Sequence, residues 1–140
     1  MSLIPERFID ILQSKALAHV ATIGPKGEPQ SSAIWFDWDG THILFAMKKE
    51  RQKYRNLLRD PRIAVSIVDP ANPYRSLEIR GRVRIEEDRN YRFINAMSQK
   101  YLNRDTTAEE GGPEEERVVI FVEAERVMPF APFQEDKKEP

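Results

Sequence analysis

The sequence predicts a mainly β domain with helical inserts, built from six antiparallel strands as a barrel or an α+β fold. Two observations support this fold class. Two apolar runs are joined by the two-residue loop Asp39-Gly40, which is typical of an antiparallel hairpin. A doubly wound parallel sheet would need a helix between successive strands, and that regular pattern is missing because the helices occur only as inserts. The length of 140 residues suits one domain with its own core.

The first third of the chain predicts one short helix and three strands. Residues 4–14 carry apolar side chains at helical spacing. Residues 16–23 (ALAHVATI) form a buried strand that ends at the turn GPKG, residues 24–27. Residues 30–38 (QSSAIWFDW) and 41–47 (THILFAM) are the two strands of the hairpin.

A basic helix is predicted over residues 49–59. Tyr54, Leu57 and Leu58 provide an apolar stripe at helical spacing, and Asp60-Pro61 ends the helix because a residue before proline disfavours the helical conformation.

The second half of the chain predicts three more strands and one helix. Residues 62–69 and 76–87 are strands, and the second has the clearest alternation of apolar and polar residues in the chain. Gly81 in the middle of that strand predicts a bulge or a close backbone approach. A helix over 88–103 and a last strand over 117–130 complete the fold. We expect one domain over 1–130, with a low-hydrophobicity loop at 104–116 and a flexible tail at 131–140.

Positive charge is concentrated in one part of an almost neutral chain. The net charge is −1, yet residues 46–63 carry seven Lys or Arg against two acids. Such a stretch is either a solvated helix face or a site for a compact anion, and charge alone leaves both explanations open. A nucleic-acid backbone would need a longer basic stripe, so we expect no nucleic-acid partner.

The motifs GEPQSS, WF followed by DG, RQKYRNLLRDPR and DPANPYRSLEIRG occur in this order between residues 28 and 81. In their order and spacing the chain resembles the pyridoxamine 5′-phosphate oxidase-like superfamily, and more narrowly its branch of coenzyme F420-dependent enzymes. The resemblance runs from about Ile11 to Val127. It implies a split β-barrel of the FMN-binding type that forms a homodimer, with FMN or coenzyme F420 bound between the subunits.

The resemblance also implies which residues bind the cofactor. Two basic side chains hold its phosphate, two serines lie near the phosphate and ribityl chain, and a strand segment follows the edge of the ring. Two further residues close the site, one of them from the other subunit. The two basic side chains are Arg51 and Lys53, and the two serines are Ser31 and Ser32. The strand segment is Ala46, Met47 and Lys48. The residues that close the site are Ser76 and, from the partner subunit, Tyr74.

The resemblance implies an oxidoreductase that moves hydride to or from an unidentified small organic substrate, with no catalytic side chain identified. The alternatives are a non-catalytic flavin or tetrapyrrole carrier or sensor and an FMN oxidase of the pyridoxamine 5′-phosphate type. The latter is disfavoured because Trp35 and Phe36 stand where that oxidase places a lysine for its phosphorylated substrate. The arginine and histidine expected near its C-terminus are also missing.

Other kinds of site have little support. His19 and His42 are the only histidines and have no second ligand at metal spacing, so we expect no metal site. Without cysteines, a signal peptide or an apolar span of membrane length, a cytoplasmic location and no membrane partner are expected. The aromatic side chains of residues 35–38 exceed what one hairpin can bury, which favours a homodimer.

Overall fold

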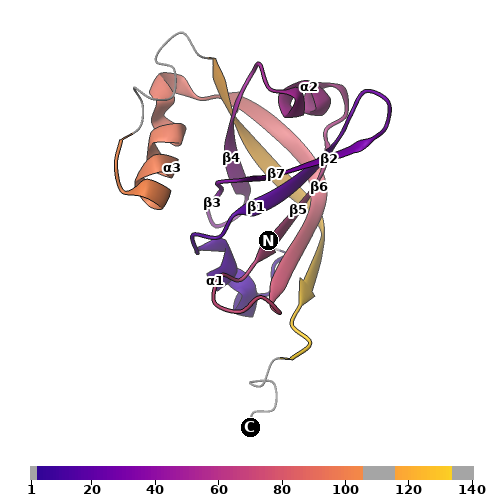
Figure 1. The fold of residues 1–140 in the computed structure, drawn as a ribbon, viewed down its shortest axis with the longest axis vertical. Helices are drawn as coiled ribbons and strands as arrows, with labels where there is room; N and C mark the ends of the chain where they lie inside the picture. Colours follow the sequence, from indigo (N-terminus) through magenta and orange to yellow (C-terminus); the bar gives the residue numbers. More distant parts are fainter. Residues whose placement is uncertain (1–2, 106–115, 134–140) are drawn as a thin grey trace.

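The computed structural model describes residues 3–105 and 116–133 as a single strongly curled antiparallel sheet with helices at its ends and side (Figure 1). The sheet has seven strands in the order β2-β1-β5-β6-β7-β4-β3. Every pairing is antiparallel, so the predicted fold class is confirmed. The strands are β1 (Ala18–Ile23), β2 (Pro29–Ile34), β3 (Asp37–Trp38), β4 (Ile43–Lys48), β5 (Arg62–Val68), β6 (Ser76–Glu87) and β7 (Arg117–Phe130).

The count of seven differs from the predicted six because the second predicted strand is divided in two. Trp35 and Phe36 interrupt it, and Phe36 turns its ring fully into the core. Trp35 stacks on Tyr101 at 5.1 Å between ring centroids, with the rings 4° from parallel. Phe36 is therefore covered by the chain itself, whereas Trp35 and Trp38 are half-buried, and the expectation that a partner chain covers them stays a prediction.

The helical segments are shorter than predicted. The N-terminal helix is one 3₁₀ turn followed by one α turn, and the basic helix begins three residues later than expected. The last helix begins late because Asn90 and Tyr91 adopt left-handed backbone angles, with φ of 58° and 54°. The segments are η1 (Glu6–Phe8), α1 (Ile9–Leu12), α2 (Gln52–Arg59), η2 (Arg89–Tyr91) and α3 (Arg92–Leu102).

The predicted irregularity at Gly81 is confirmed. The β6–β7 register shifts between Arg80 and Gly81. A Cβ atom at Gly81 would collide with the carbonyl oxygen of Glu123, so the two backbones approach too closely for any side chain.

The core lies inside the curl of the sheet. Its largest buried side chains are Phe8, Phe36 and Phe45, which come from the N-terminal turn, the β2–β3 bend and β4. The helices lie around this barrel-like body: α2 across the upper end in Figure 1, α3 at one side and α1 at the lower end. None of the helices in the described part of the chain is both long and apolar enough to cross a membrane. Most of the predicted loop and most of the predicted tail fall outside the described residues.

Candidate functional site

The basic segment between β4 and β5 forms a helix whose cations differ in their surroundings. Arg55 donates to the carbonyl oxygen of Glu50 and to Gln52, each at 2.8 Å. Arg59 donates to the carbonyl oxygen of Ile23 at 2.6 Å. These two arginines are therefore occupied in holding the ends of α2.

Arg51 and Lys53 have no such partners. Neither side chain forms a hydrogen bond or ion pair with the residues that the structure describes. Lys53 is half-buried, and its pKa is lowered, first by burial and then by the positive charge of Arg51. A partly desolvated ammonium without a counter-charge is costly, which makes this end of α2 favourable for an anion.

The backbone at this helix end adds to the preference. Arg51 caps α2 without a side-chain hydrogen bond, and no acidic residue lies in the first turn. The first N–H groups of a helix point outward and carry its positive dipole end, and a phosphate can accept hydrogen bonds from them.

A buried amide fixes the position of this helix against the sheet. Asn56 is fully buried, and its Nδ2 donates to Thr22 on β1 at 2.9 Å and to Gln30 on β2 at 2.8 Å. Its Oδ1 accepts from Gln52 at 2.9 Å. The sequence interpretation missed Asn56, although a polar residue beside the apolar stripe of a helix was a signal that could have identified it.

The contacts of α2 follow β1 and β2 in order. Arg59 meets Ile23 near the turn, and Asn56, one turn earlier, meets Gln30. One helical turn rises about 5.4 Å and two strand residues about 6.6 Å, so the next turn back brings Lys53 toward Ser32. The Oγ of Ser32 is buried and has no hydrogen-bond partner among the described residues. From this order of contacts we infer that the hydroxyl of Ser32 and the ammonium of Lys53 lie over the same part of the sheet.

The strand that leads into α2 has an uncovered edge. β3 pairs with β4 only at Ile43 and Leu44, so β4 beyond these residues has no second neighbour among the described strands. Met47 points into the core, whereas Ala46 and Lys48 are half-buried on the other face. Backbone groups along Ala46–Lys48 can therefore meet a planar molecule that lies beside the strand.

A cavity of about 390 Å³ separates the edges of β2 and β4, beside α3. The cavity can hold part of a multi-ring molecule, and small side chains from both strands line it. None of its lining residues is charged: they are Leu17, Ala33, Ile34, Trp35, Ala46, Ile94 and Met97.

Three predicted site residues lie elsewhere, two on the outer face of the sheet and one in the connection between β5 and β6. Ser31 is exposed on the face of β2 opposite to Ser32. Ser76 aligns with Val68 and Phe130 on the outer face, and Tyr74, 59% exposed, packs its ring against Phe133. Within one chain, Arg51 and Lys53 follow directly on Ala46–Lys48, and Ser32 shares the face of β2 that contacts α2, whereas Ser31, Tyr74 and Ser76 lie apart from that face.

The arrangement can hold an anion at the α2 end and an uncharged planar group between β2 and β4. No group of three potential metal ligands occurs within residues 3–105 and 116–133. The chemistry of the site therefore resembles a place for a phosphorylated aromatic molecule, since phosphate and ring would each find a suitable environment.

Comparisons with known proteins agree with this picture. A family model described as pyridoxamine 5′-phosphate oxidase matches residues 4–129. A solved structure described as an F420 reductase is 35% identical to this chain, with 89% of this chain and 98% of that one covered and a TM-score of 0.78. No curated protein sequence matches the chain.

Two further solved structures share the fold. A conserved hypothetical protein from Mycobacterium tuberculosis is 24% identical over 93% of this chain and 86% of its own, with a TM-score of 0.74. A heme binding protein from Mycobacterium smegmatis is 18% identical over 94% of this chain and 56% of its own, with a TM-score of 0.66. At these identities the likeness extends to the fold alone.

Proposed function

Because this chain belongs to the pyridoxamine 5′-phosphate oxidase family, we propose that it is an oxidoreductase that uses coenzyme F420 or FMN to move hydride to or from a small organic substrate. The observation that carries the proposal is Lys53, a half-buried cation with no acidic partner among the described residues, placed where the uncovered edge of β4 meets α2. The likeness to an F420 reductase at 35% identity favours the deazaflavin.

In this proposal the residues have separate tasks. Arg51, Lys53 and the first N–H groups of α2 bind the phosphate, and the hydroxyl of Ser32 donates to it or to the adjoining chain. The backbone of Ala46–Lys48 orients the ring edge, while the apolar side chains around the cavity exclude water. The bound cofactor supplies the hydride chemistry, so no side chain has to act as a nucleophile.

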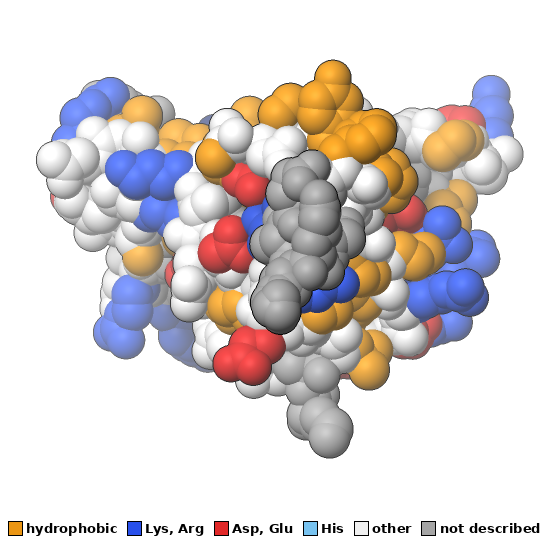
Figure 2. Space-filling model, turned by 90° about the horizontal axis from the view of Figure 1, so that it is seen from below, with side chains coloured by type: hydrophobic (Ala, Val, Ile, Leu, Met, Phe, Trp, Pro, Cys, Tyr) orange, Lys and Arg blue, Asp and Glu red, His pale blue; other side chains and the backbone are white. Residues whose placement is uncertain are grey.

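We also propose that the working unit is a homodimer with the cofactor between the subunits. Ser31 and Ser76 lie on the outer face, where a second copy can bring Tyr74 of the partner subunit to the site. Apolar side chains are exposed on this face: Val68, Tyr74, Phe130 and Phe133. Figure 2 shows orange patches among the charged side chains at one end of the molecule, the largest at the top of the view. A cytoplasmic location remains part of the proposal.

Titration of the purified protein with FMN, FAD and coenzyme F420, followed by fluorescence or calorimetry, tests the function. We expect saturable binding of F420 or FMN at micromolar concentration or below, and reduction or oxidation of the bound cofactor by an added donor or acceptor. Absence of saturable binding up to millimolar concentration contradicts the proposal. Tight binding with no turnover by any donor or acceptor would instead indicate a carrier.

A further inference from the structure

The polar side chains between α2 and the sheet form one continuous chain of hydrogen bonds. Nη2 of Arg55 donates to Oε1 of Gln52 at 2.8 Å, and Nε2 of Gln52 donates to Oδ1 of Asn56 at 2.9 Å. Nδ2 of Asn56 donates to Oε1 of Gln30 at 2.8 Å, and Nε2 of Gln30 donates to Oε2 of Glu28 at 3.3 Å. The chain of hydrogen bonds therefore runs from the first turn of α2 to the connection between β1 and β2.

The two ends of this chain fix the direction of every hydrogen bond in it. Arg55 can only donate and an ionised Glu28 can only accept, so each amide between them has one orientation that satisfies both neighbours. The backbone N–H groups of Glu28 itself and of Lys26 lower the pKa of the Glu28 carboxyl, which is therefore ionised at neutral pH. A Cβ atom on Gly24 would collide with this carboxylate, so the glycine leaves room for it.

The middle of the chain is buried and contacts both strands. Asn56 is fully buried, and its Nδ2 also donates to Oγ1 of Thr22 at 2.9 Å. Thr22 and Gln30 lie opposite each other in the β1–β2 ladder, and both face α2. Ser32 follows two positions after Gln30 on the same face of β2. The chain therefore fixes α2 relative to the strand that carries Ser32.

At the other end, Arg55 holds the residues on both sides of Arg51. Its Nη1 donates to the carbonyl oxygen of Glu50 at 2.8 Å, while its Nη2 donates to Gln52. Arg51 lies between these two residues as the N-cap of α2, with an extended backbone. The hydrogen bonds of Arg55 therefore determine how the backbone enters the helix, and with it the direction of the first N–H groups of α2.

We propose that Gln30, Gln52 and Asn56 are positioning residues for a phosphate at this turn, so that a phosphorylated cofactor binds more tightly than the same molecule without its phosphate. This inference rests on the proposed function, which assigns the cofactor phosphate to the start of α2. The three side chains are uncharged, so they contribute geometry and not attraction. Hydrogen bonds weaken steeply when the angle at the donor hydrogen falls below about 120°, so a rotation of the turn reduces phosphate binding and leaves the ring contacts unchanged.

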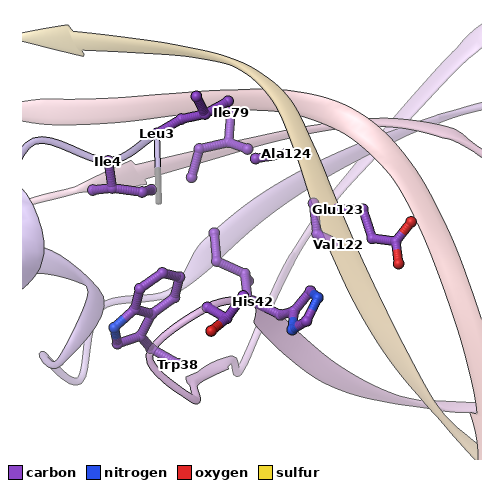
Figure 3. Close-up of a pocket in the computed structure, with 10 residues that line it drawn as sticks. Leu3, Ile4, Trp38, His42, Ile79, Val122, Glu123 and Ala124 are labelled. Carbon is purple, nitrogen blue, oxygen red and sulfur yellow. The ribbon is translucent and has the colours of Figure 1, made fainter. Parts of the chain in front are cut away.

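Two other cavities formed by the described residues are less suited to phosphate. One, of about 270 Å³, lies at the far end of β4, and Figure 3 shows Trp38 on one side of it with Ile4 and Ile79 on the other. Its described lining contains no lysine or arginine. The second, of about 310 Å³, lies around Gly81. It is bordered by three arginines that each form an ion pair with an acid, namely Arg62, Arg80 and Arg82.

Titration of the full chain with inorganic phosphate, followed by the backbone amide NMR signals of residues 51–53, tests the positioning without a flavin. We expect saturable shifts in the wild type and roughly threefold to tenfold weaker affinity in Gln52→Met, the effect of about one neutral hydrogen bond. Gln52 is exposed, so the variant should keep its fold. Gln99→Met, on the exposed side of α3, is the matched control and should bind phosphate as the wild type does. Absence of saturable shifts in the wild type, or equal affinity in Gln52→Met, overturns the proposal.

The ratio of the dissociation constants of riboflavin and FMN measures what the phosphate contributes to cofactor binding. Gln52→Met and Gln30→Met should lower this ratio roughly threefold to tenfold and change the affinity for riboflavin by less than about twofold. Thr22→Val removes a buried acceptor but leaves the chain from Arg55 to Glu28 unbroken. It should therefore lower the thermal transition and keep the ratio. An equal fall of the ratio in Thr22→Val and Gln52→Met would indicate a loss of stability and overturn the proposal.

The two measurements separate this proposal from the proposed function. If phosphate binds at residues 51–53 and binds more weakly in Gln52→Met, while neither FMN nor coenzyme F420 binds, the proposed function fails and the positioning of a phosphate stands. If FMN binds more tightly than riboflavin by the same ratio in the wild type and in every variant, the proposed function stands and the positioning role fails.

Discussion

Lys53 differs from the arginines beside it in what surrounds its charge. Arg55 and Arg59 donate hydrogen bonds to acceptors within the chain. The ammonium of Lys53 is half-buried and has no acceptor in the described structure. The net charge of α2 would be the same if Lys53, Arg55 and Arg59 were all exposed to water. It is the local partner of each cation, and not the sum of charges, that indicates where an anion binds.

Arg51→Ala and Lys53→Ala should each weaken binding of FMN or coenzyme F420 by roughly tenfold to a hundredfold, because each removes a charge-assisted hydrogen bond of about 1.5–3 kcal/mol. Fluorescence titration measures the effect. Arg59→Ala at the other end of α2 is the control and should change binding little. Equal losses at all three positions would indicate a diffuse field instead of a phosphate site.

Asn56→Leu should lower the free energy of unfolding by roughly 1–3 kcal/mol, because it leaves the buried hydroxyl of Thr22 and the amide of Gln30 without their shared donor. Urea denaturation measures the change. Gln99→Leu, on the exposed side of α3, is the matched control and should stay within about 0.5 kcal/mol. A similar loss in both variants would show that Asn56 does not anchor α2.

At the scale of elements, Arg75 joins the N-terminal turns to the connection between β5 and β6. Its guanidinium donates to Asp10 at 2.7 and 2.9 Å and to Asp69 at 2.9 Å, and lies over the ring of Phe8 at 4.8 Å from its centroid. The hydrogen bonds from Arg75 lower the pKa of Asp10, although burial opposes this. One buried arginine thus holds two segments that are 65 positions apart in sequence.

The contribution of Asp10 to stability should depend on pH. Its folded pKa lies below its ordinary value of 3.8, so the stabilisation is complete above that value and is lost as pH falls through the lowered pKa. Asp10→Asn should therefore cost up to about 1 kcal/mol near pH 6, because Asp10 is largely exposed, and almost nothing near pH 2. Denaturation at several pH values, with Glu6→Gln as control, measures the difference. A cost that does not change with pH would exclude the ion pair as its cause.

The bounds of the elements were predictable where local pattern and tertiary packing agree. β6 begins and ends as predicted because its alternation of apolar and polar residues matches one buried and one open face. The division of the second strand was not predictable, since it depends on Phe36 entering the core and Trp35 finding Tyr101, far along the chain. Likewise, of the two left-handed residues before α3 only Asn90 carries a local signal, and nothing in the sequence indicates that Tyr91 shares this conformation.

The candidate site was predictable to a smaller extent. The sequence placed Arg51 and Lys53 at a helix start, and α2 begins at Gln52. It could not show that Ser31 and Ser32 face opposite sides of the sheet with only the second toward α2, nor that Asn56 fixes the helix. Those facts depend on strand register and on contacts between residues more than twenty positions apart.

At the scale of the whole molecule, the outer face of the sheet determines the proposed assembly. Val68, Ser76 and Phe130 lie side by side across three strands, with the two apolar residues exposed. A second copy that covers this row would also complete the cofactor site, so assembly and cofactor binding should be linked.

Phe130→Asp should therefore weaken both dimer formation and cofactor binding. In a two-fold dimer both subunits carry the new charge, so the contact face contains it twice. Sedimentation with and without cofactor measures the first effect, and titration the second. Leu102→Asp, an exposed apolar residue on α3, is the control and should alter neither. A 16.3 kDa monomer that binds one cofactor tightly would contradict the shared site.

The position of β7 has a consequence for how the chain folds. β7 lies between β6 and β4, so β4 gains its main neighbour only after some seventy intervening residues have been synthesised. Before then, the apolar strand that leads to the cofactor site is paired only with the two residues of β3, and its open edges can pair with another chain. Because this closure is so distant in sequence, we expect refolding in milliseconds to seconds and a strong dependence of its yield on protein concentration.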